Sequence, residues 1–415
     1  MQDNEKKPAL RFKGFTDPWE QRKLSELTSM HARIGWQNLR TSEFLDSGDY
    51  MLITGTDFDD GTVNYSTCHF VERERYEQDK NIQIRNGSIL ITKDGTLGKV
   101  AYVQGLSMPA TLNAGVFNVE IRNTSIVDER YLFQYLKAPF LMDYVDKKAT
   151  GGTIKHLNQN ILVDFPVVMP KKTEQVSIGN FFQRIDTLIT LHQRKYEKLV
   201  NIKKSMLNKM FPPNGASVPE IRFKGFTDPW EQRKISELAE KTYGGGTPTT
   251  SNEAFWNGNI PWIQSSDIVD GKLMGVEPRK YITQTGLNSS ATQLVPKDSI
   301  AIITRVGVGK LAYMPFSYST SQDFLSLSKL NTEPFFTVYA CYKKLQSELN
   351  TVQGTSIKGI TKDELLAKTI SVPVYSEQKQ IGSFFTQLDT LITLHQRKLE
   401  KLQNIKKSCL EKMFV

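Results

Sequence analysis

Two long segments of the chain carry an apolar position at every third or fourth residue. In the first, residues 174–211, the spacing alternates between four and three, and proline is absent until Pro212. This spacing predicts a helix with a coiled-coil seam that the proline ends. About 38 residues at 1.5 Å each would give a helix of roughly 57 Å. Its seam is predicted to contain Ile185, Ile189, His192, Tyr196 and Leu199, continuing with a slip through Ile202, Met206 and Met210.

The second segment, residues 389–414, repeats residues 186–211 with four changes in 26 residues. Two helices of matching register in one chain most simply pack on each other. Because His192 and His395 fall on the seams, we expect them to pack or set the register, not to bind a ligand. The second seam is predicted to contain Leu388, Ile392, His395, Leu399 and Leu402, followed by Ile405, Cys409 and Met413.

A second phrase is also repeated. Residues 11–27 and 222–238 differ only at Leu24, which becomes Ile235. Asp17-Pro18 and Asp228-Pro229 resemble helix starts, because Asp caps free amides and Pro suits the first helical position. The Asp-Pro-Pro-Trp motif of amino-methyltransferases is the alternative, but its second proline is missing in both copies and no glycine-rich cofactor loop of the expected kind precedes it. The two nearly identical segments would offer partners two equivalent docking surfaces. The unlike inserts between them would each recognise a different target.

The inserts alternate β-rich runs with clusters of Gly, Asp, Asn and Thr. The runs Tyr50–Thr54, Ile89–Thr92 and Ile300–Thr304 are predicted strands. One local pattern recurs: GSILITKDGTLGKVAYV (87–103) and DSIAIITRVGVGKLAYM (298–314) both read as strand, basic glycine turn and strand. The glycines would let the backbone approach a phosphate beside a lysine, although a plain hairpin turn explains them equally well. The spacing is not that of a Walker A motif.

The composition is that of a globular chain, with 39% hydrophobic and 23% charged residues. No run of about 18 apolar residues suggests a membrane span, and the first residues lack the apolar core of a signal peptide. Cys68, Cys341 and Cys409 are dispersed, and the five histidines are scattered. We therefore expect a reduced, cytoplasmic protein without a metal site.

The net charge of +9 is concentrated in the two long segments. Residues 186–211 contain six basic and two acidic residues, and residues 389–414 contain six basic and three acidic residues. These segments hold most of the excess positive charge. They could form solvated helix faces, or a basic stripe that attracts a polyanion such as nucleic acid.

The strongest motif precedes each long helix. TGGTIKHLNQNILVDFPVVMPKKTEQVSIGNFFQRID (150–186) aligns with QGTSIKGITKDELLAKTISVPVYSEQKQIGSFFTQLD (353–389). A turn ending in Ile-Lys, a strand marked by proline and an E-Q-x-x-I-G-x-F-F helix start, present twice, resemble the specificity subunit of type I restriction–modification systems. Residues 244–268 are similar to one class of target recognition domain in that family, and residues 31–58 to another. The resemblance covers essentially the whole chain.

This resemblance implies an α+β fold with an internal pseudo-two-fold repeat. Two mixed α/β target recognition domains would be separated by two long helices packed as an antiparallel coiled coil. The implied domains are residues 1–170 with head segment 11–27, the central helix 171–215, residues 216–373 with head segment 222–238, and the distal helix 374–415.

The resemblance also implies the function. Each recognition domain would read one half of an asymmetric bipartite DNA site, and the helices would set the gap. Two modification subunits, which methylate adenine N6, would dock on the repeated frames. Restriction subunits, which translocate and cleave DNA with ATP, would join that core. The chain would be non-catalytic, with S-adenosylmethionine, ATP and Mg²⁺ bound by its partners. A stand-alone sequence-specific DNA-binding regulator and a purely structural coiled-coil scaffold are the alternatives.

The candidate DNA contacts come from the shared turns and from polar side chains after Pro261-Trp262. Gln264, Ser265, Ser266 and Asp267 suit base edges, with Arg33, Trp36 and Gln37 as the weaker analogue in the first insert. Trp256 and Trp262 are expected in the core. Lys155 and Lys358 could touch the DNA backbone or only cap the approach to the helix. The candidates on the shared hairpins are Lys93, Gly95, Gly98, Lys99, Arg305, Gly307, Gly309 and Lys310.

Overall fold

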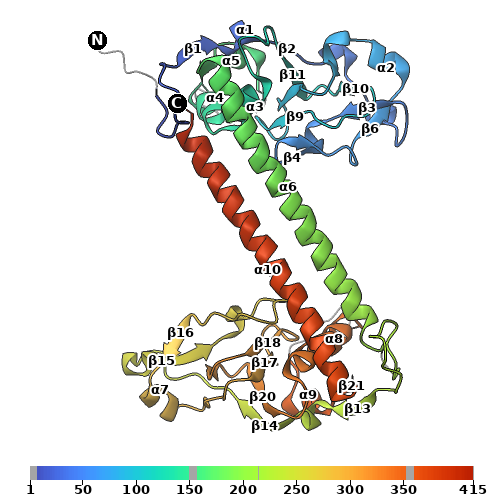
Figure 1. Ribbon diagram of the computed structural model, residues 1–415, viewed down its shortest axis with the longest axis vertical. Coiled ribbons are helices and arrows are strands. Elements are labelled where there is room, and N and C mark those ends of the chain that lie inside the picture. Colours follow the sequence, from blue (N-terminus) through green and yellow to red (C-terminus); the bar gives the residue numbers. More distant parts are fainter. Residues whose placement is uncertain (1–6, 149–156, 214, 352–358, 415) are drawn as a thin grey trace. The chain divides into compact units, whose positions relative to one another are not determined.

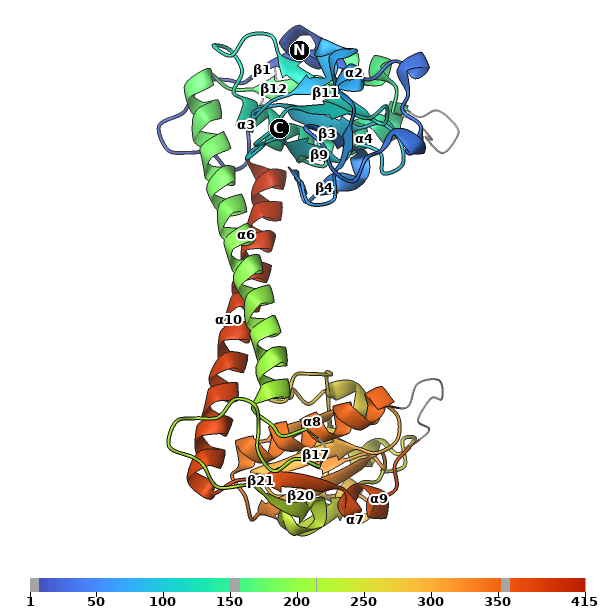
Figure 2. The ribbon, with the colours of Figure 1, turned by 90° about the vertical axis from the view of Figure 1, so that its right-hand side faces the viewer.

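The computed structural model describes residues 7–148, 157–213, 215–351 and 359–414, and the chain forms two compact units (Figures 1 and 2). Unit 1 consists of Met1–His192 and Lys398–Val415, and unit 2 of Gln193–Arg397. The predicted long helices are confirmed as α6 (Lys172–Lys209) and α10 (Tyr375–Lys412), each of 38 residues. Each unit therefore combines sheets and short helices with a part of both long helices.

Unit 1 has two four-stranded sheets in its described part. The first has the order β2-β11-β8-β9 and is antiparallel throughout. The second has the order β6-β3-β10-β7, in which β3 and β10 run parallel. The predicted strands at Tyr50 and Ile89 are confirmed as β3 and β8. The bounds are β2 Thr28–His31, β11 Val116–Ile121, β8 Ile89–Thr92, β9 Val100–Tyr102, β6 His69–Val71, β3 Tyr50–Ile53, β10 Ala110–Leu112 and β7 Gln83–Ile84, with the small hairpin β4 Phe58–Asp59 and β5 Thr62–Val63 beside them.

Unit 2 repeats this plan. Its antiparallel sheet has the order β14-β20-β17-β18, and its second sheet has the order β16-β15-β19 with β15 and β19 parallel. The predicted strand at Ile300 is confirmed as β17. The bounds are β14 Ala239–Gly244, β20 Phe324–Leu330, β17 Ser299–Ile303, β18 Leu311–Met314, β16 Lys280–Ile282, β15 Trp256–Ile263 and β19 Ser319–Thr320. Shorter helices complete both units. In unit 1 they are α1 Leu24–Leu27, α2 Arg73–Glu77, α3 Glu129–Lys137, α4 Phe140–Lys148 and α5 Gln159–Val163, and in unit 2 they are α7 Gln284–Asn288, α8 Pro334–Thr351 and α9 Lys362–Ala367.

The repeated Asp-Pro-Trp segments begin strands, so their prediction as helix starts was wrong. β1 (Glu20–Lys23) pairs antiparallel with β12 (Pro166–Met169), and β13 (Glu231–Lys234) pairs in the same way with β21 (Thr369–Val372). The carboxylate of Asp17 accepts an ion pair from Lys171 at 2.8 Å instead of capping a helix. Pairing with a strand distant in sequence satisfies the backbone amides that a helix cap would otherwise satisfy, so it outweighs the local capping signal.

A buried ion pair ties each head segment to the first turn of a long helix. In unit 1, both Nε and Nη2 of Arg11 donate to the two oxygens of Glu174 at 2.7 Å, and Glu174 is only 2% exposed. In unit 2, Arg222 makes the same fork to Glu377 at 2.7 and 2.8 Å. These pairs explain the glutamate of the repeated motif, because a buried carboxylate needs a charged and hydrogen-bonded partner.

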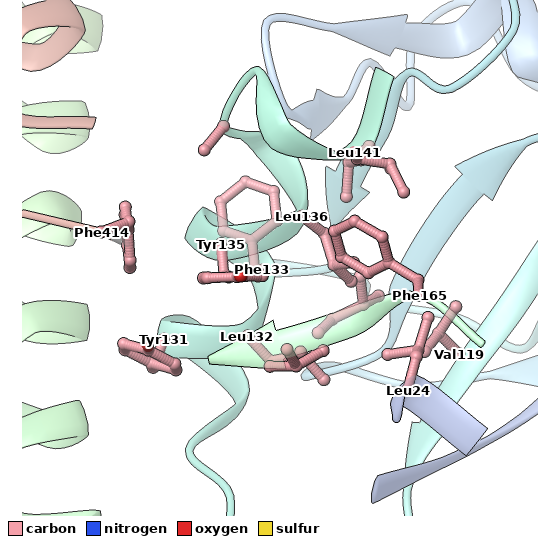
Figure 3. Packing of buried hydrophobic residues seen from close by; sticks show 14 of the residues in the cluster. Leu24, Val119, Tyr131, Leu132, Phe133, Tyr135, Leu136, Leu141, Phe165 and Phe414 are labelled. Atoms are coloured by element: carbon pink, nitrogen blue, oxygen red, sulfur yellow. The ribbon is translucent and has the colours of Figure 1, made fainter. Parts of the chain in front are cut away.

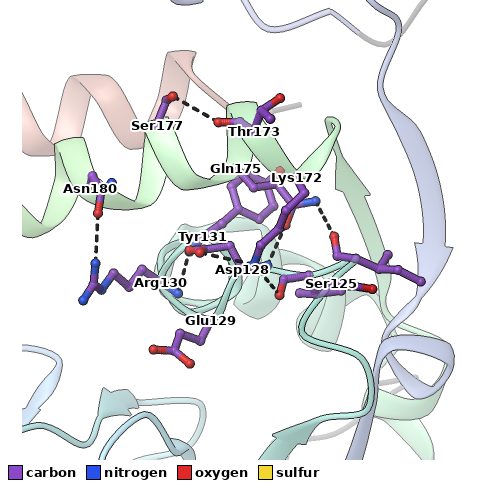
Figure 4. Close-up of polar contacts among 12 residues, drawn as sticks. Ser125, Asp128, Glu129, Arg130, Tyr131, Lys172, Thr173, Gln175, Ser177 and Asn180 are labelled. Atoms are coloured by element: carbon purple, nitrogen blue, oxygen red, sulfur yellow. Dashed lines mark hydrogen bonds and ion pairs between the residues drawn. The ribbon is translucent and has the colours of Figure 1, made fainter.

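The glutamine and glycine of the motif hold the start of a second helix against the first turns of each long helix. Gln175 accepts from the backbone N–H of Asp128 and donates to the carbonyl of Pro170, both at 2.8 Å. Asp128 in turn caps α3 (Figure 4). A Cβ on Gly179 would lie 2.9 Å from Cβ of Arg130, so only glycine permits this approach. In unit 2, Gln378 makes the equivalent bonds to Glu333 and Pro373, and Gly382 allows the same approach to α8.

The phenylalanines of the motif close the core of each unit. In unit 1, Phe182 of α6 stacks on Phe414 at 5.7 Å between ring centres. Figure 3 shows Phe414 facing α3, whose Tyr131 and Tyr135 it contacts edge-on at 5.5 Å. In unit 2, Phe385 lies 5.9 Å from Phe211 in the same way. The end of one long helix therefore packs against the start of the other within each unit, which makes their ends antiparallel.

The residues predicted for the helix seams differ in burial. Ile185, Ile189 and Leu388 are buried. Ile405 is 39% exposed, so its assignment to the seam was wrong; the neighbouring Lys406 is buried instead. The half-buried members are His192, Tyr196, Leu199, Ile392, His395, Leu399 and Leu402.

Each unit also places one ion pair between the long helices. In unit 1, Nζ of Lys406 lies 2.5 Å from Asp186, which also accepts from Gln134 at 2.9 Å. In unit 2, Nζ of Lys203 lies 2.6 Å from Asp389. The two pairs use the same two positions of the repeated helix sequence, once in each direction.

Replacing Arg11 by methionine should destabilise unit 1 by about 3 kcal/mol, because it leaves the buried Glu174 carboxylate without a partner. Urea unfolding followed by tryptophan fluorescence would measure the loss. Lys23→Met is the matched control, since its pair with Asp164 is exposed and should be worth less than about 1 kcal/mol. Equal losses in the two variants would contradict the role assigned to the buried pair.

Candidate nucleic-acid interface

The shared hairpins form in both units. β8 and β9 enclose a turn from Lys93 to Lys99, and β17 and β18 enclose the corresponding turn from Thr304 to Lys310. Gly95, Gly98, Gly307 and Gly309 all have positive φ, which the tight turns require. The prediction of a strand, a glycine turn and a strand is therefore confirmed.

The basic side chains of these turns differ in their surroundings. Lys99 and Arg305 are exposed, and Lys310 is half-buried. Lys93 is also half-buried, and its Nζ lies 5.6 Å from the ring centre of Phe117. Exposed cations on a rigid turn can meet phosphates without rearranging the backbone. Because Lys93 is partly engaged by the aromatic face of Phe117, Lys99 is the more accessible of the two lysines in this turn.

A second segment lies against the hairpin turn in unit 1. It is the loop that follows the parallel strand β10, residues 113–115. The N–H of Asn113 donates to the carbonyl of Ile53 at the end of β3, at 2.9 Å. The carbonyl of Gly115 accepts from the N–H of Lys93 at 2.8 Å. The loop thus joins the end of one sheet to the hairpin turn of the other.

Unit 2 makes the same two bonds. The N–H of Ser321 donates to the carbonyl of Ile263 at 2.9 Å, and the carbonyl of Asp323 accepts from Thr304 at 2.7 Å. The loop 321–323 is therefore the counterpart of 113–115. Neither loop carries a sequence signal, because β10 and β19 are only three and two residues long and show no alternating pattern.

The third part of this surface is the turn after β3 in unit 1 and the turn after β15 in unit 2. In unit 2, Asp267 is buried and accepts from the N–H of Gln264 at 3.0 Å, so Gln264, Ser265 and Ser266 lie on the rim of the turn. In unit 1, Asp57 accepts from the N–H of Thr54 at 2.8 Å. The counterpart of 264–267 is therefore 54–57, and the shared Ile-x-x-x-Asp spacing was the signal for it.

The fourth part is the segment that follows the shared Ile-Lys sequence. The N–H of Leu157 donates to the carbonyl of Lys93 at 2.8 Å, and the N–H of Ile360 donates to Thr304 at 2.7 Å. Lys155 and Lys358 themselves lie outside the described residues. We call the surface formed by the hairpin turn, the loop after the parallel strand, the turn held by the buried aspartate and this fourth segment the "polar edge" of each unit.

Of the predicted first-insert analogue Arg33, Trp36 and Gln37, the side chain of Trp36 lies outside the description, and the placement at Arg33 and Gln37 was wrong. Arg33 is 1% exposed and donates to the carbonyl of Leu112 at 3.0 Å. Burial lowers the pKa of its guanidinium, and the nearby positive charge of Arg75 lowers it further. Gln37 is also buried. Arg33 is hydrogen-bonded to β10 in the interior, and the burial of both side chains keeps them away from a duplex.

The two tryptophans of the second insert behave as expected of core residues. Trp262 is buried, and its indole N–H donates to the carbonyl of Gly246 at 3.0 Å. Trp256 is half-buried and meets Trp262 edge-on, with ring centres 5.1 Å apart. Nζ of Lys280 lies within 5.8 Å of both ring centres.

The described residues offer little for cofactor or redox chemistry. No group of three or more His, Cys, Asp or Glu within 7–148, 157–213, 215–351 and 359–414 could hold a metal ion. Burial raises the pKa of the Cys68 and Cys341 thiols to about 12, which leaves them unreactive at neutral pH. Over the same ranges no helix has the length and apolar character needed to cross a bilayer.

Comparison with known proteins identifies the architecture. The family model of the type I restriction modification DNA specificity domain matches residues 16–201 and again residues 227–404. The chain belongs to this family. Specificity subunits are non-catalytic and hold no cofactor; S-adenosylmethionine, ATP and Mg²⁺ belong to the modification and restriction subunits. The resemblance drawn from the E-Q-x-x-I-G-x-F-F motifs is therefore confirmed.

This chain is similar at low sequence identity to other specificity subunits. It is 22% identical over 405 residues to the putative type I restriction enzyme MjaX specificity subunit of Methanocaldococcus jannaschii, covering 94% of this chain and 91% of that one. It is 30% identical over 169 residues to the EcoR124I/EcoR124II specificity subunit of Escherichia coli, covering 39% and 41%. The crystal structure of the type I restriction–modification S subunit from M. genitalium matches 99% of both chains at 15% identity with a TM-score of 0.66, which confirms the predicted α+β fold.

Gly309→Ala should destabilise unit 2 by about 1 kcal/mol more than Gly307→Ala. Both glycines have φ near +90°, so the backbone strain is matched. A Cβ on Gly309 would lie 2.3 Å from Cδ1 of Leu349 in α8, whereas a Cβ on Gly307 meets only the flexible Lys310 side chain at 3.7 Å. Thermal unfolding would measure the difference. Indistinguishable melting temperatures would show that the turn does not depend on its seat against α8.

Proposed function

We propose that this specificity subunit reads an asymmetric bipartite DNA site, with one recognition domain for each half. The recognition domains would be residues 1–170 and 216–373. The observation that carries this proposal is the polar edge, which both units build with the same backbone hydrogen bonds but line with different side chains. One scaffold used twice with unlike surfaces suits two half-sites of unlike sequence.

The hairpin turns supply the phosphate contacts in this proposal. Lys99 and Lys310 occupy the same position of the two turns, directly after Gly98 and Gly309. Arg305 adds an exposed cation in unit 2, and Lys93, Lys155 and Lys358 remain candidates for the same role. Lysines that meet the phosphate backbone position a protein on the duplex without selecting a sequence.

Sequence selection is assigned to the remaining polar edge. Gln264, Ser265 and Ser266 have side chains that can pair with base edges in the major groove, where all four base pairs are distinguishable. Half-sites met from one face of the duplex would lie about one helical turn apart. The adenine to be methylated in each half must leave the base stack to reach the active site of a partner subunit.

Modification subunits would dock on exposed leucines of the long helices. Leu188 and Leu191 are 43% and 44% exposed in unit 1, and their counterparts Leu391 and Leu394 are each 43% exposed in unit 2. Two leucines three residues apart share one helix face and form a suitable anchor for an amphipathic partner. Because the pair is repeated in both copies, we propose two modification subunits, which restriction subunits would then join in the cytoplasm.

Deleting the gene should abolish one bipartite N6-methyladenine motif from host DNA, which sequencing that detects methylated adenine would reveal. Replacing residues 244–330 by the same region of another specificity subunit should change one half of the motif and leave the other half intact. Loss of no motif, or a change in both halves, would contradict the assignment of one recognition domain to each half-site.

Leu188→Gln/Leu191→Gln should weaken binding of the modification subunit by at least about tenfold, because both anchors lose apolar contact area. Titration of the purified chain with modification subunit would measure it. Val200→Gln is the matched control: Val200 is also exposed, but the second helix has Gln403 at that position, so the change should be harmless. A loss in the control equal to that of the leucine variant would place docking elsewhere.

A further inference from the structure

Some equivalent positions of the two polar edges have the same residue in both units, and others have different residues. Asp57 and Asp267 hold the same turn, and Lys99 and Lys310 end the same hairpin turn. Other positions lie at the same place in these turns and loops but have different side chains. In unit 2 against unit 1 these are Gln264 for Thr54, Arg305 for Asp94 and Gln322 for Ala114. If kept residues build the surface, the changed ones carry the information that differs between half-sites.

Gln322 is the changed residue with the most defined geometry. It is exposed and lies in the loop after β19, between Ser321 and Asp323, whose backbones are both fixed by the bonds described above. Its Oε1 accepts a hydrogen bond from the hydroxyl of Thr247 at 2.6 Å. The carboxamide is therefore oriented before any ligand arrives. No described residue accepts from its amide nitrogen.

The Gly-Gly-Gly run of residues 244–246 brings Thr247 to this position. A Cβ on Gly245 would lie 1.8 Å from the carbonyl oxygen of Ser321, and a Cβ on Gly246 would lie 2.5 Å from the backbone nitrogen of Thr292. The N–H of Gly246 donates to the carbonyl of Thr320 at 2.8 Å. Gly245 and Gly246 thus allow a close approach that a side chain would block, and they place Thr247 beside Gln322.

We propose that Gln322 is a base-reading residue of the second recognition domain and that Thr247 is its positioning residue. The inference rests on the proposed function and names the chemistry at this point of the edge. A carboxamide can accept from N6 and donate to N7 of adenine in the major groove. The oxygen of Gln322 keeps a second lone pair beside the Thr247 hydroxyl, and its nitrogen is available to donate. Gln322 is thus presented for an adenine.

The corresponding position of the first domain has a different chemistry. Ala114 is half-buried, and its N–H donates to the side chain of Asn113 at 2.8 Å. A methyl group at this point can contact the methyl group of thymine but cannot pair with adenine. The same place in the two domains therefore selects different base pairs, as an asymmetric site requires.

The test uses the complete complex of this chain with its modification subunits and a library of duplexes randomised at each position of the wild-type motif. Gln322→Ala should reduce discrimination at one base pair of one half-site by about 10- to 100-fold. Gln322→Glu should shift that position towards cytosine, whose N4 donates to a carboxylate. Thr247→Val should relax the same position to a smaller extent. Thermal unfolding would confirm that these exposed substitutions leave the fold intact.

Lys310→Ala is the matched comparison, because loss of a phosphate contact lowers affinity for all sequences and reduces the salt slope by about one. A wild-type motif that Gln322→Ala leaves unchanged at every position would overturn this inference alone. A Gln322→Ala effect that is uniform across sequences, as for Lys310→Ala, would also overturn it. If the wild-type complex methylates no bipartite motif, the proposed function fails and the inference fails with it.

Discussion

The buried fork between an arginine of the head segment and the first glutamate of a long helix is the interaction on which each unit depends. Glu174 and Glu377 are almost fully buried, and a carboxylate removed from water without a partner would cost several kcal/mol. The head segment, its strand partner and the helix start must therefore assemble together. This requirement explains why the repeated phrases stay nearly identical while the inserts between them differ.

The fixed frame lets the polar edge vary without risk to the fold. The loop after the parallel strand is held by backbone groups at Asn113 and Gly115 in unit 1, and at Ser321 and Asp323 in unit 2. Side chains between these anchors take no part in the bonds. Substituting Gln322 or Ala114 should therefore alter what the surface binds more than how stable it is. In the proposed mode of binding, specificity would change by substitution at a few rim positions, while the charge at Lys99 and Lys310 would retain the general affinity for DNA.

The parts predicted from sequence are those that depend on local pattern. The limits of α6 follow from apolar spacing and Pro212, and the hairpins follow from glycine turns between β-rich runs. The head segments were misread because the partner of β1 is β12, far away in sequence, and no local signal announces that pairing. Arg33 was misread for a related reason, since only the tertiary structure surrounds its guanidinium with β10 and buries it. The loop at Gln322 was missed because its strand is too short to show a period.

The antiparallel ends of the helices allow one sequence to close both units. Asp186 and Lys203 in α6 have the counterparts Asp389 and Lys406 in α10, separated by the same interval. In unit 1 the aspartate comes from α6 and the lysine from α10, and in unit 2 the origins are exchanged. A slip of one helical turn at either end would separate a partly buried ion pair and leave both charges poorly solvated. The pair thus specifies register where apolar seam residues alone would tolerate a shift. Because both junctions use the same two positions, a helix duplicated as a whole supplies its own partner.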